Sequence, residues 1–156
     1  MKKFTKILKN QKGLTLIELL AVIVILAIVA AIAVPSIGNI VNNSKDKAIL
    51  SEASNVIAGA KIAVTEEKCS TTTANNITTT TCSSSNLLPY VEGITFASSG
   101  DQVVKTVAAD NTTTWTLTYA KLGKIKNTTK FTGGGFTPGA ANLTITETQL
   151  NTILTN

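Results

Sequence analysis

Few side chains in this 156-residue protein have the chemistry that catalysis needs. The sequence contains 14 lysines, 9 acidic residues and 2 cysteines, but no histidine and no arginine. Histidine is the usual general base near neutral pH, so its absence excludes Ser-His-Asp triads, Cys-His pairs and histidine-ligated metal centres. No nucleophile stands beside another candidate base. We therefore expect a protein that is not an enzyme and that needs no cofactor or metal.

Glu18 is the carboxylate with the most unusual surroundings. It is followed by an uncharged apolar run of 16 residues, Leu19 to Val34. About 20 apolar residues cross the core of a bilayer, so we expect a transmembrane helix over residues 14–34. An ionised side chain inside a bilayer costs a few kcal/mol unless it is paired or lies near the interface. Glu18 is therefore expected to have a specific partner.

The lysines before this segment predict its orientation. Five of the 14 lysines lie in the first 12 residues, and the remaining nine balance the nine acidic residues of the body. Positive residues before an apolar helix keep the N-terminus in the cytoplasm and send the rest of the chain outside. The body has no net side-chain charge and no arginine, so we expect no direct binding to nucleic acid.

The residues around Glu18 resemble the N-terminus of a type IV prepilin. They read KGLTLIE over residues 12–18 and are followed by the long aliphatic run and by Pro35. The resemblance implies that residues 1–13 are a leader, and that prepilin peptidase cuts between Gly13 and Leu14 and N-methylates Leu14. It also implies that Glu18 faces the Leu14 amine of a neighbouring subunit in a filament. Pairing would neutralise both groups where water is excluded.

Two other interpretations of the segment remain open. An ordinary secretory signal peptide would be cut after Ala33, because Ala31-Ile32-Ala33 fits the small-x-small pattern. Its apolar region would, however, be longer than usual and would contain Glu18. A permanent single-span anchor is the second alternative, and the charge of Glu18 argues against it as well.

A second helical pattern follows Pro35. Apolar residues recur at spacings of four and three, whereas the charged residues Lys45, Asp46, Lys47, Glu52 and Lys61 fall mostly on other faces. The apolar positions are Ile49, Ala53, Val56, Ala60 and Ala63. We expect one long helix over residues 14–68, amphipathic over 36–68 and kinked at Pro35 with Gly38 adding flexibility. Two helices broken between Pro35 and Gly38 are the alternative.

Residues 69–86 consist almost entirely of Ser, Thr and Asn. This composition is typical of a surface loop. Cys69 and Cys82 bracket 12 of these residues. An even cysteine count in an exported chain favours a disulfide between them, which would contribute about 3 kcal/mol of stability.

The rest of the chain alternates apolar and polar residues. Val103 to Val107 and Trp115 to Tyr119 flank the turn-like pair Asp110-Asn111, which predicts a hairpin with the Trp115 face inward. Residues 94–97 and 143–146 are further strand candidates, and residues 148–154 fit a short helix or a strand. We expect an α+β fold in which a long kinked N-terminal helix packs on an antiparallel sheet of three or four strands. Residues 69–156 would form this head.

The family resemblance implies a structural subunit, or pilin, of a type IV pilus, a fimbrial surface filament with a role in cell adhesion. The expected partners are other pilin subunits, prepilin peptidase, and the assembly platform with its ATPase machinery. The precursor would reside in the cytoplasmic membrane and the assembled subunit on the cell surface. A pseudopilin of a type II secretion or competence DNA-uptake machine is the alternative, and a secreted binding or adhesive module is a third. Lysine without arginine and a Thr/Asn-rich head would suit a low-GC Gram-positive bacterium.

Overall fold

The computed structural model describes residues 15–139 and 143–155. Its first element is a single helix, α1 (Leu16–Thr65), which continues through Pro35. The two-helix alternative is therefore wrong. The helix ends three residues before the predicted boundary because Glu67 adopts a left-handed φ of 58°. The N–H groups of Glu67 and Lys68 turn back to the carbonyls of Val64 and Ala63, at 3.2 and 3.0 Å, which closes the helix in a Schellman motif.

The chain divides into two compact units, residues 1–40 and residues 41–156. In the described part of the first unit, α1 is the only element, and it is long and apolar enough to cross a membrane by length and composition. A signal sequence near the N-terminus would pass the same test. The second unit, which we call the head, contains the rest of α1 and all further elements.

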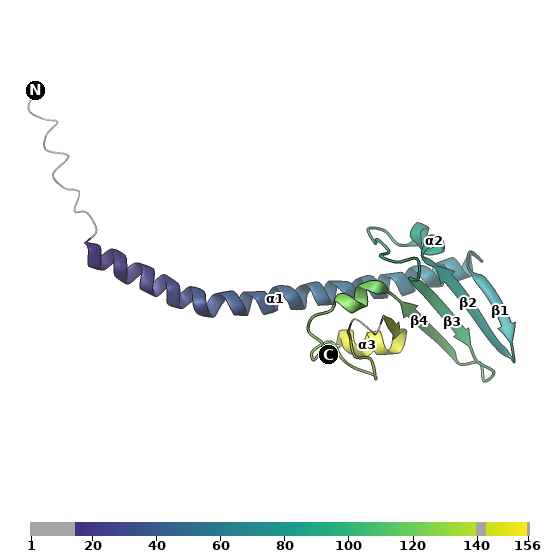
Figure 1. Cartoon of the computed structure of the whole chain (residues 1–156). Coiled ribbons are helices and arrows are strands. Elements are labelled where there is room, and N and C mark those ends of the chain that lie inside the picture. Colours follow the sequence, from purple (N-terminus) through teal and green to yellow (C-terminus); the bar gives the residue numbers. More distant parts are fainter. Residues whose placement is uncertain (1–14, 140–142, 156) are drawn as a thin grey trace, which may run out of the picture. The chain divides into compact units, whose positions relative to one another are not determined.

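The described strands of the head form one five-stranded antiparallel sheet in sequence order (Figure 1). The strands are β1 (Ser70–Ala74), β2 (Ile77–Ser83), β3 (Gln102–Val107), β4 (Thr113–Thr118) and β5 (Thr144–Thr146). Short helices connect or follow them: α2 (Ser84–Leu87), η1 (Leu88–Tyr90), η2 (Ala120–Lys124) and α3 (Glu147–Thr155). The predicted α+β class is confirmed, with more strands than expected.

The predicted hairpin is confirmed as β3 and β4, with Lys105 opposite Trp115 and Val103 opposite Leu117. Leu117 is buried, whereas Trp115 packs at the edge of the core and is half-buried. The strand predicted over residues 143–146 is β5, and the undecided residues 148–154 lie in helix α3.

The strand predicted over residues 94–97 is wrong. This segment has no regular structure, and the N–H of its last residue bonds to a side chain instead of to a neighbouring strand. The N–H groups of Ala97 and Ser98 both donate to Oδ2 of Asp101, at 2.9 and 3.2 Å. Asp101 is itself buried and also accepts the N–H of Ala120 at 2.7 Å.

The loop predicted over residues 69–86 is also wrong, because most of it forms the β1–β2 hairpin. Threonine is β-branched and favours strands. Asn75 and Asn76 have φ of 51° and 62°, the two left-handed values that a tight type I′ turn requires. Threonine hydroxyls pair across the strands, for example Thr71 with Thr80 at 3.0 Å. The surface position was nevertheless predicted correctly for β1, since all five of its residues are exposed.

The amphipathic part of α1 covers one face of the sheet, as predicted. Its buried stripe packs against apolar side chains of the strands and of α3. The stripe consists of Leu50, Ala53, Val56, Ile57, Ala60 and Ala63. Asp46 lies four residues before Leu50 on the same face and is only 2% exposed, so its predicted place on another face is wrong. Its buried position is explained by its hydrogen bonds, described below.

Candidate functional site

Glu18 forms a capping box with Thr15 at the start of α1. The Thr15 N–H donates to Oε2 of Glu18 at 2.7 Å, and the Glu18 N–H donates to the Thr15 hydroxyl oxygen at 3.3 Å. The Thr15 hydroxyl in turn donates to Oε2 at 2.9 Å. These reciprocal bonds satisfy backbone donors that the first helical turn leaves unpaired. We did not predict this motif, although Thr-x-x-Glu before an apolar run is its sequence signature.

All of the capping bonds to the carboxylate use Oε2, so Oε1 takes no part in them. A carboxylate at this position also lies at the positive end of the helix dipole. The cap therefore gives Glu18 local hydrogen-bond partners while leaving one oxygen to accept from an external cation. Gly13 and Leu14, the predicted cleavage and methylation residues, lie outside the described residues.

The apolar residues after Glu18 are exposed to an unusual degree. From Leu16 to Val34 every side chain except the half-buried Ala33 is exposed, and Leu16 reaches 83%. Exposed apolar stretches of this size mark surfaces that contact a membrane or another protein. Along the first unit, α1 is thus a surface that needs lipid or further helices around it.

Pro35 and Gly38 lie inside α1, as predicted. A proline in a helix removes one backbone donor and crowds the preceding turn. A Cβ atom on Gly38 would meet no atom within 4 Å, so close packing does not explain this glycine. The kink itself stays a prediction.

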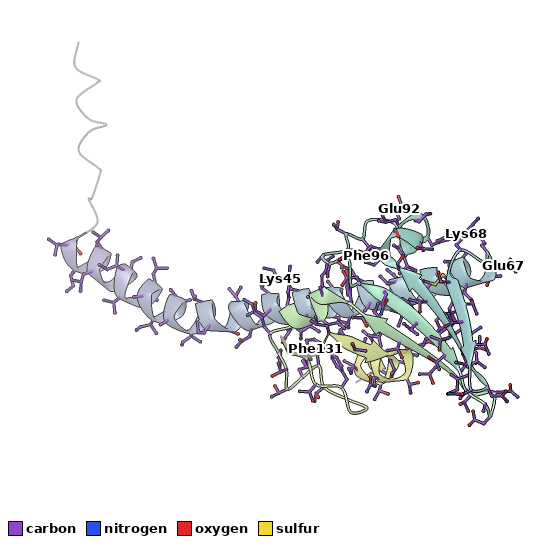
Figure 2. All side chains as sticks on the ribbon, turned by 45° about the vertical axis from the view of Figure 1, so that its right-hand side comes forward. Lys45, Glu67, Lys68, Glu92, Phe96 and Phe131 are labelled. Carbon is purple, nitrogen blue, oxygen red and sulfur yellow. A yellow bond between two sulfur atoms is a disulfide. The ribbon has the colours of Figure 1, made fainter. Side chains whose placement is uncertain are left out.

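Cys69 and Cys82 form a disulfide in the head, visible as a yellow bond in Figure 2. Cys82 is buried in β2, and Cys69 immediately precedes β1. The bond therefore closes the open end of the β1–β2 hairpin, opposite its tight turn. This pairing agrees with the sequence-based prediction.

Buried carboxylates connect α1 to the loops of the head. Asp46 accepts the Lys126 N–H at 3.1 Å and the Asn127 N–H at 2.8 Å. Buried backbone donors need such partners, so removing the carboxylate would leave two of them unpaired. The sequence signal for Asp46 was its position four residues before Leu50, on the buried stripe.

Glu52 forms a second connection, to η2 and the residue before it. The Tyr119 hydroxyl donates to Oε2 of Glu52 at 2.8 Å, and Nζ of Lys121 donates to the same oxygen at 2.6 Å. Partial burial opposes the charge of Glu52, but the bonds from Lys121 and Tyr119 outweigh it, so the pKa of Glu52 lies below its ordinary value. Burial also raises the pKa of Tyr119 to about 12.

Among the described residues, no three His, Cys, Asp or Glu side chains gather in a group that could hold a metal ion. The distinctive features of the described chain are therefore a capped, exposed apolar helix and a disulfide-closed head.

Comparison with protein families finds the prokaryotic N-terminal methylation motif at residues 8–34. This match covers the predicted cleavage residues, the capping box and the apolar run. No curated protein and no solved structure matches the chain.

Proposed function

We propose that this chain, a type IV prepilin-like precursor with an apolar N-terminal helix, is a structural subunit of a type IV pilus. The observation that carries the proposal is the N-terminal methylation motif at residues 8–34, which coincides with the exposed apolar start of α1. The motif implies processing by prepilin peptidase and assembly into a pilus-like filament. The apolar helix supports insertion of the precursor into the membrane.

Processing begins while the lysine-rich leader is in the cytoplasm and the head is outside. Prepilin peptidase hydrolyses the bond between Gly13 and Leu14, which releases residues 1–13. Methylation of the new Leu14 amine leaves a secondary amine that is still cationic at neutral pH. Thr15 then becomes the second residue of the mature subunit, and the capping box remains intact because neither of its residues is removed.

Assembly brings that amine to the carboxylate of another subunit. The Leu14 ammonium of one subunit donates to Glu18 of its neighbour, and Oε1 is the oxygen that the capping bonds leave for it. An ion pair in a water-poor environment is favourable only when both charges have partners. The pair therefore selects the register in which each incoming helix stops, whereas burial of the apolar side chains supplies the attraction.

The head requires an oxidising environment for its disulfide. Structural disulfides persist outside the cytoplasm, so the bond between Cys69 and Cys82 supports an extracellular location. Pilus assembly platform and ATPase proteins are the expected machinery, and adhesion is the expected role of the finished surface filament.

The direct test is recovery of filaments from the native host. Cells are sheared, the released material is imaged by electron microscopy, and its protein bands are identified by mass spectrometry. Long filaments whose dominant band is this chain would support the pilus subunit. Absence of surface filaments, with the processed chain retained at the membrane, would favour a pseudopilin of a secretion or DNA-uptake machine and contradict the proposal.

A further inference from the structure

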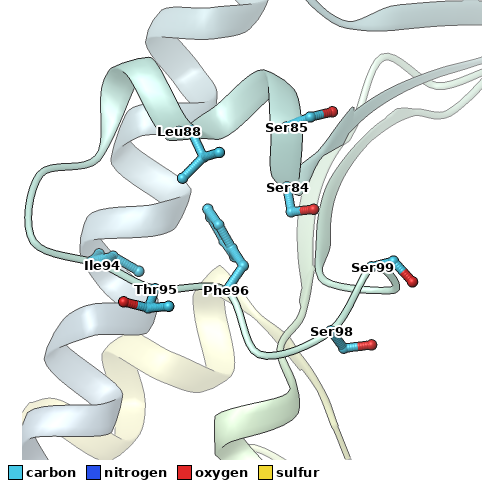
Figure 3. Close-up of a pocket in the computed structure, with 8 residues that line it drawn as sticks. All are labelled: Ser84, Ser85, Leu88, Ile94, Thr95, Phe96, Ser98 and Ser99. Atoms are coloured by element: carbon cyan, nitrogen blue, oxygen red, sulfur yellow. The ribbon is translucent and has the colours of Figure 1, made fainter.

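The head has an open pocket between α2 with η1 on one side and the irregular segment of residues 94–99 on the other (Figure 3). Its volume is about 480 Å³. Leu88, Ile94 and Phe96 provide its apolar walls, and Ser84, Ser85 and Ser98 lie on its rim. A pocket with apolar walls and a hydroxyl rim fits an apolar side chain that carries polar neighbours.

The pocket walls are held in place before anything binds. The Phe96 ring packs edge-on against the buried Tyr119 ring, with centroids 6.3 Å apart. Ile94 is buried, and the following residues are fixed by the bonds to Asp101. Leu88 is 55% exposed, which is unusual for a leucine outside the apolar half of α1. A preformed pocket of this kind requires little ordering on binding.

The pocket residue Ser84 directly follows the last residue of β2. At the other end of β2, the head exposes a further apolar side chain. Among the described residues after Val41, the large apolar side chains that remain exposed are Ile62, Ile77 and Leu88. Ile77 is 41% exposed and directly follows the Asn75-Asn76 turn at the tip of the β1–β2 hairpin. The two left-handed asparagines make this tip a tight turn, and they directly precede Ile77 in the sequence.

The tip and the pocket match in chemistry. The apolar side chain of Ile77 suits the apolar walls, and the amides of Asn75 and Asn76 can donate to and accept from the serine hydroxyls of the rim. Neither surface is charged, because no Lys, Asp or Glu occurs from Cys69 to Val91 or from Ile94 to Ser99. Contact between them therefore requires no charge to lose its water.

Their positions on the fold determine what kind of assembly they would form. Ile77 begins β2 and Ser84 follows its last residue, so the tip and the pocket lie about 20 Å apart at about 3.3 Å per strand residue. One molecule cannot fill its own pocket with its own tip. A tip of one copy in the pocket of another leaves a free tip and a free pocket, which is the heterologous geometry that forms open chains.

We propose that the β1–β2 hairpin tip of one subunit docks in the pocket between α2 and residues 94–99 of a second copy of this chain. This inference rests on the proposed filament and identifies a contact between heads within it. A single apolar anchor makes each contact weak. In a filament the contact is strengthened because the helices already hold the heads at high effective concentration.

The test places cysteines at the two contact positions of the full-length chain, Ile77→Cys and Leu88→Cys, in the native host. A short bis-maleimide, which reacts with free thiols and not with the native disulfide, is applied to whole cells and to sheared material. Because each double-variant copy carries both halves of the contact, we expect a ladder of dimers, trimers and larger species in denaturing gels. Each single variant should remain monomeric. The matched control, Ile62→Cys with Leu88→Cys, pairs the pocket with another exposed isoleucine and should give no ladder.

The outcomes separate this inference from the proposed function. Filaments without a ladder, or an equal ladder from the Ile62 control, would overturn the docking contact and leave the filament standing. A ladder on whole cells that yield no filaments would support the contact and contradict the pilus. Absence of a ladder from the double variant, together with absence of filaments from cells that carry the unsubstituted chain, would overturn both.

Discussion

Glu18 has one interaction that the structure shows and a second that belongs to the proposed filament. Its Oε2 caps the helix through Thr15, and in the proposed filament its charge pairs with the Leu14 amine of another subunit. The capping partner explains how a carboxylate can lie at the start of an apolar helix before any neighbour arrives. The two interactions can be separated by substitution, because the cap needs a hydrogen-bond acceptor whereas the ion pair needs a charge.

We therefore predict that Glu18→Gln abolishes filament formation while leaving the processed subunit in the membrane. Glutamine is accepted at this position of a capping box, so the helix start is retained and only the charge is lost. Thr15→Ala is the matched change, since it weakens the cap by about 0.5–2 kcal/mol and keeps the charge. It should still form filaments. Quantifying sheared filaments and membrane-bound subunit checks both, and wild-type filament yield from Glu18→Gln would contradict the charge pair.

Glu52 gives the head a specific response to acid. The folded pKa of Glu52 is lowered, so its contribution to stability is present above its ordinary pKa of 4.5 and is lost as pH falls through the lowered value. We predict that Glu52→Gln is less stable than the wild type at neutral pH but loses less stability on acidification below pH 4.5. Thermal unfolding of the full chain in detergent over this range provides the measurement.

The matched control for this prediction is Glu92→Gln, which removes a carboxylate from an exposed position of the head. It should retain the acid dependence of the wild type. Parallel pH profiles for the wild type and Glu52→Gln would mean that the bonds from Tyr119 and Lys121 do not stabilise the charged form of Glu52.

At the scale of elements, features that depend on adjacent residues could be predicted from the sequence, whereas features that depend on particular side-chain hydrogen bonds could not. The apolar run and its prepilin-like flank could be predicted because they depend on adjacent residues alone. The alternating pattern of residues 94–97 predicts a strand, but the Ala97 N–H bonds to the side chain of Asp101, which the pattern does not reveal. The position of Asp46 could have been inferred from its spacing to Leu50, but its backbone partners at residues 126 and 127 could not.

The β1–β2 hairpin shows how composition can mislead. A Thr-rich segment is typical of both loops and strands, and only the Asn75-Asn76 pair distinguishes the two by supplying a tight turn. The disulfide was easier to predict, because two cysteines in an exported chain allow one pairing. The pocket beside α2 could not be predicted, since its walls come from segments that no sequence pattern brings together.

Opening the disulfide should loosen this hairpin first. β1 is an edge strand with β2 as its neighbour in the sheet, and the bond between Cys69 and Cys82 closes their open end. We predict that Cys69→Ala with Cys82→Ala lowers the free energy of unfolding by about 3 kcal/mol. Hydrogen exchange should accelerate in β1 and β2 more than in β3 and β4, which serve as the internal control. A uniform acceleration across the sheet would contradict this prediction.

Within the head, helix α1 lies close to the end of η1 at Gly59. A Cβ atom there would lie 2.6 Å from Cγ1 of Val91 and 2.9 Å from the Tyr90 carbonyl oxygen. We predict that Gly59→Ala destabilises the full chain by about 1–3 kcal/mol, because overpacking outweighs the gain in helix propensity. Gly38→Ala, where the added atom meets nothing, should raise helix stability by up to about 1 kcal/mol. Thermal melts in detergent measure both, and equal effects would contradict the close approach.

At the scale of the whole molecule, the two units differ in whether their apolar side chains are buried or exposed to solvent. The head buries a core shared by α1, the sheet and α3, whereas the described part of the first unit exposes its large apolar side chains from Leu16 to Ile40. A membrane would cover these apolar side chains in the precursor, and in the proposed filament neighbouring helices would cover them. In the proposed function, cleavage after Gly13 would connect the two states, because it would create the amine that pairs with Glu18.

The most direct test of this account is the intact mass and N-terminal sequence of the protein from its native host. We predict a chain that starts at N-methylated Leu14, with Cys69 and Cys82 oxidised, because prepilin processing creates the amine on which assembly depends. A start at Val34 would identify a secreted protein cut by signal peptidase and remove the assembly helix. An intact Met1 would leave a membrane-anchored domain. Either of these results would contradict the filament account.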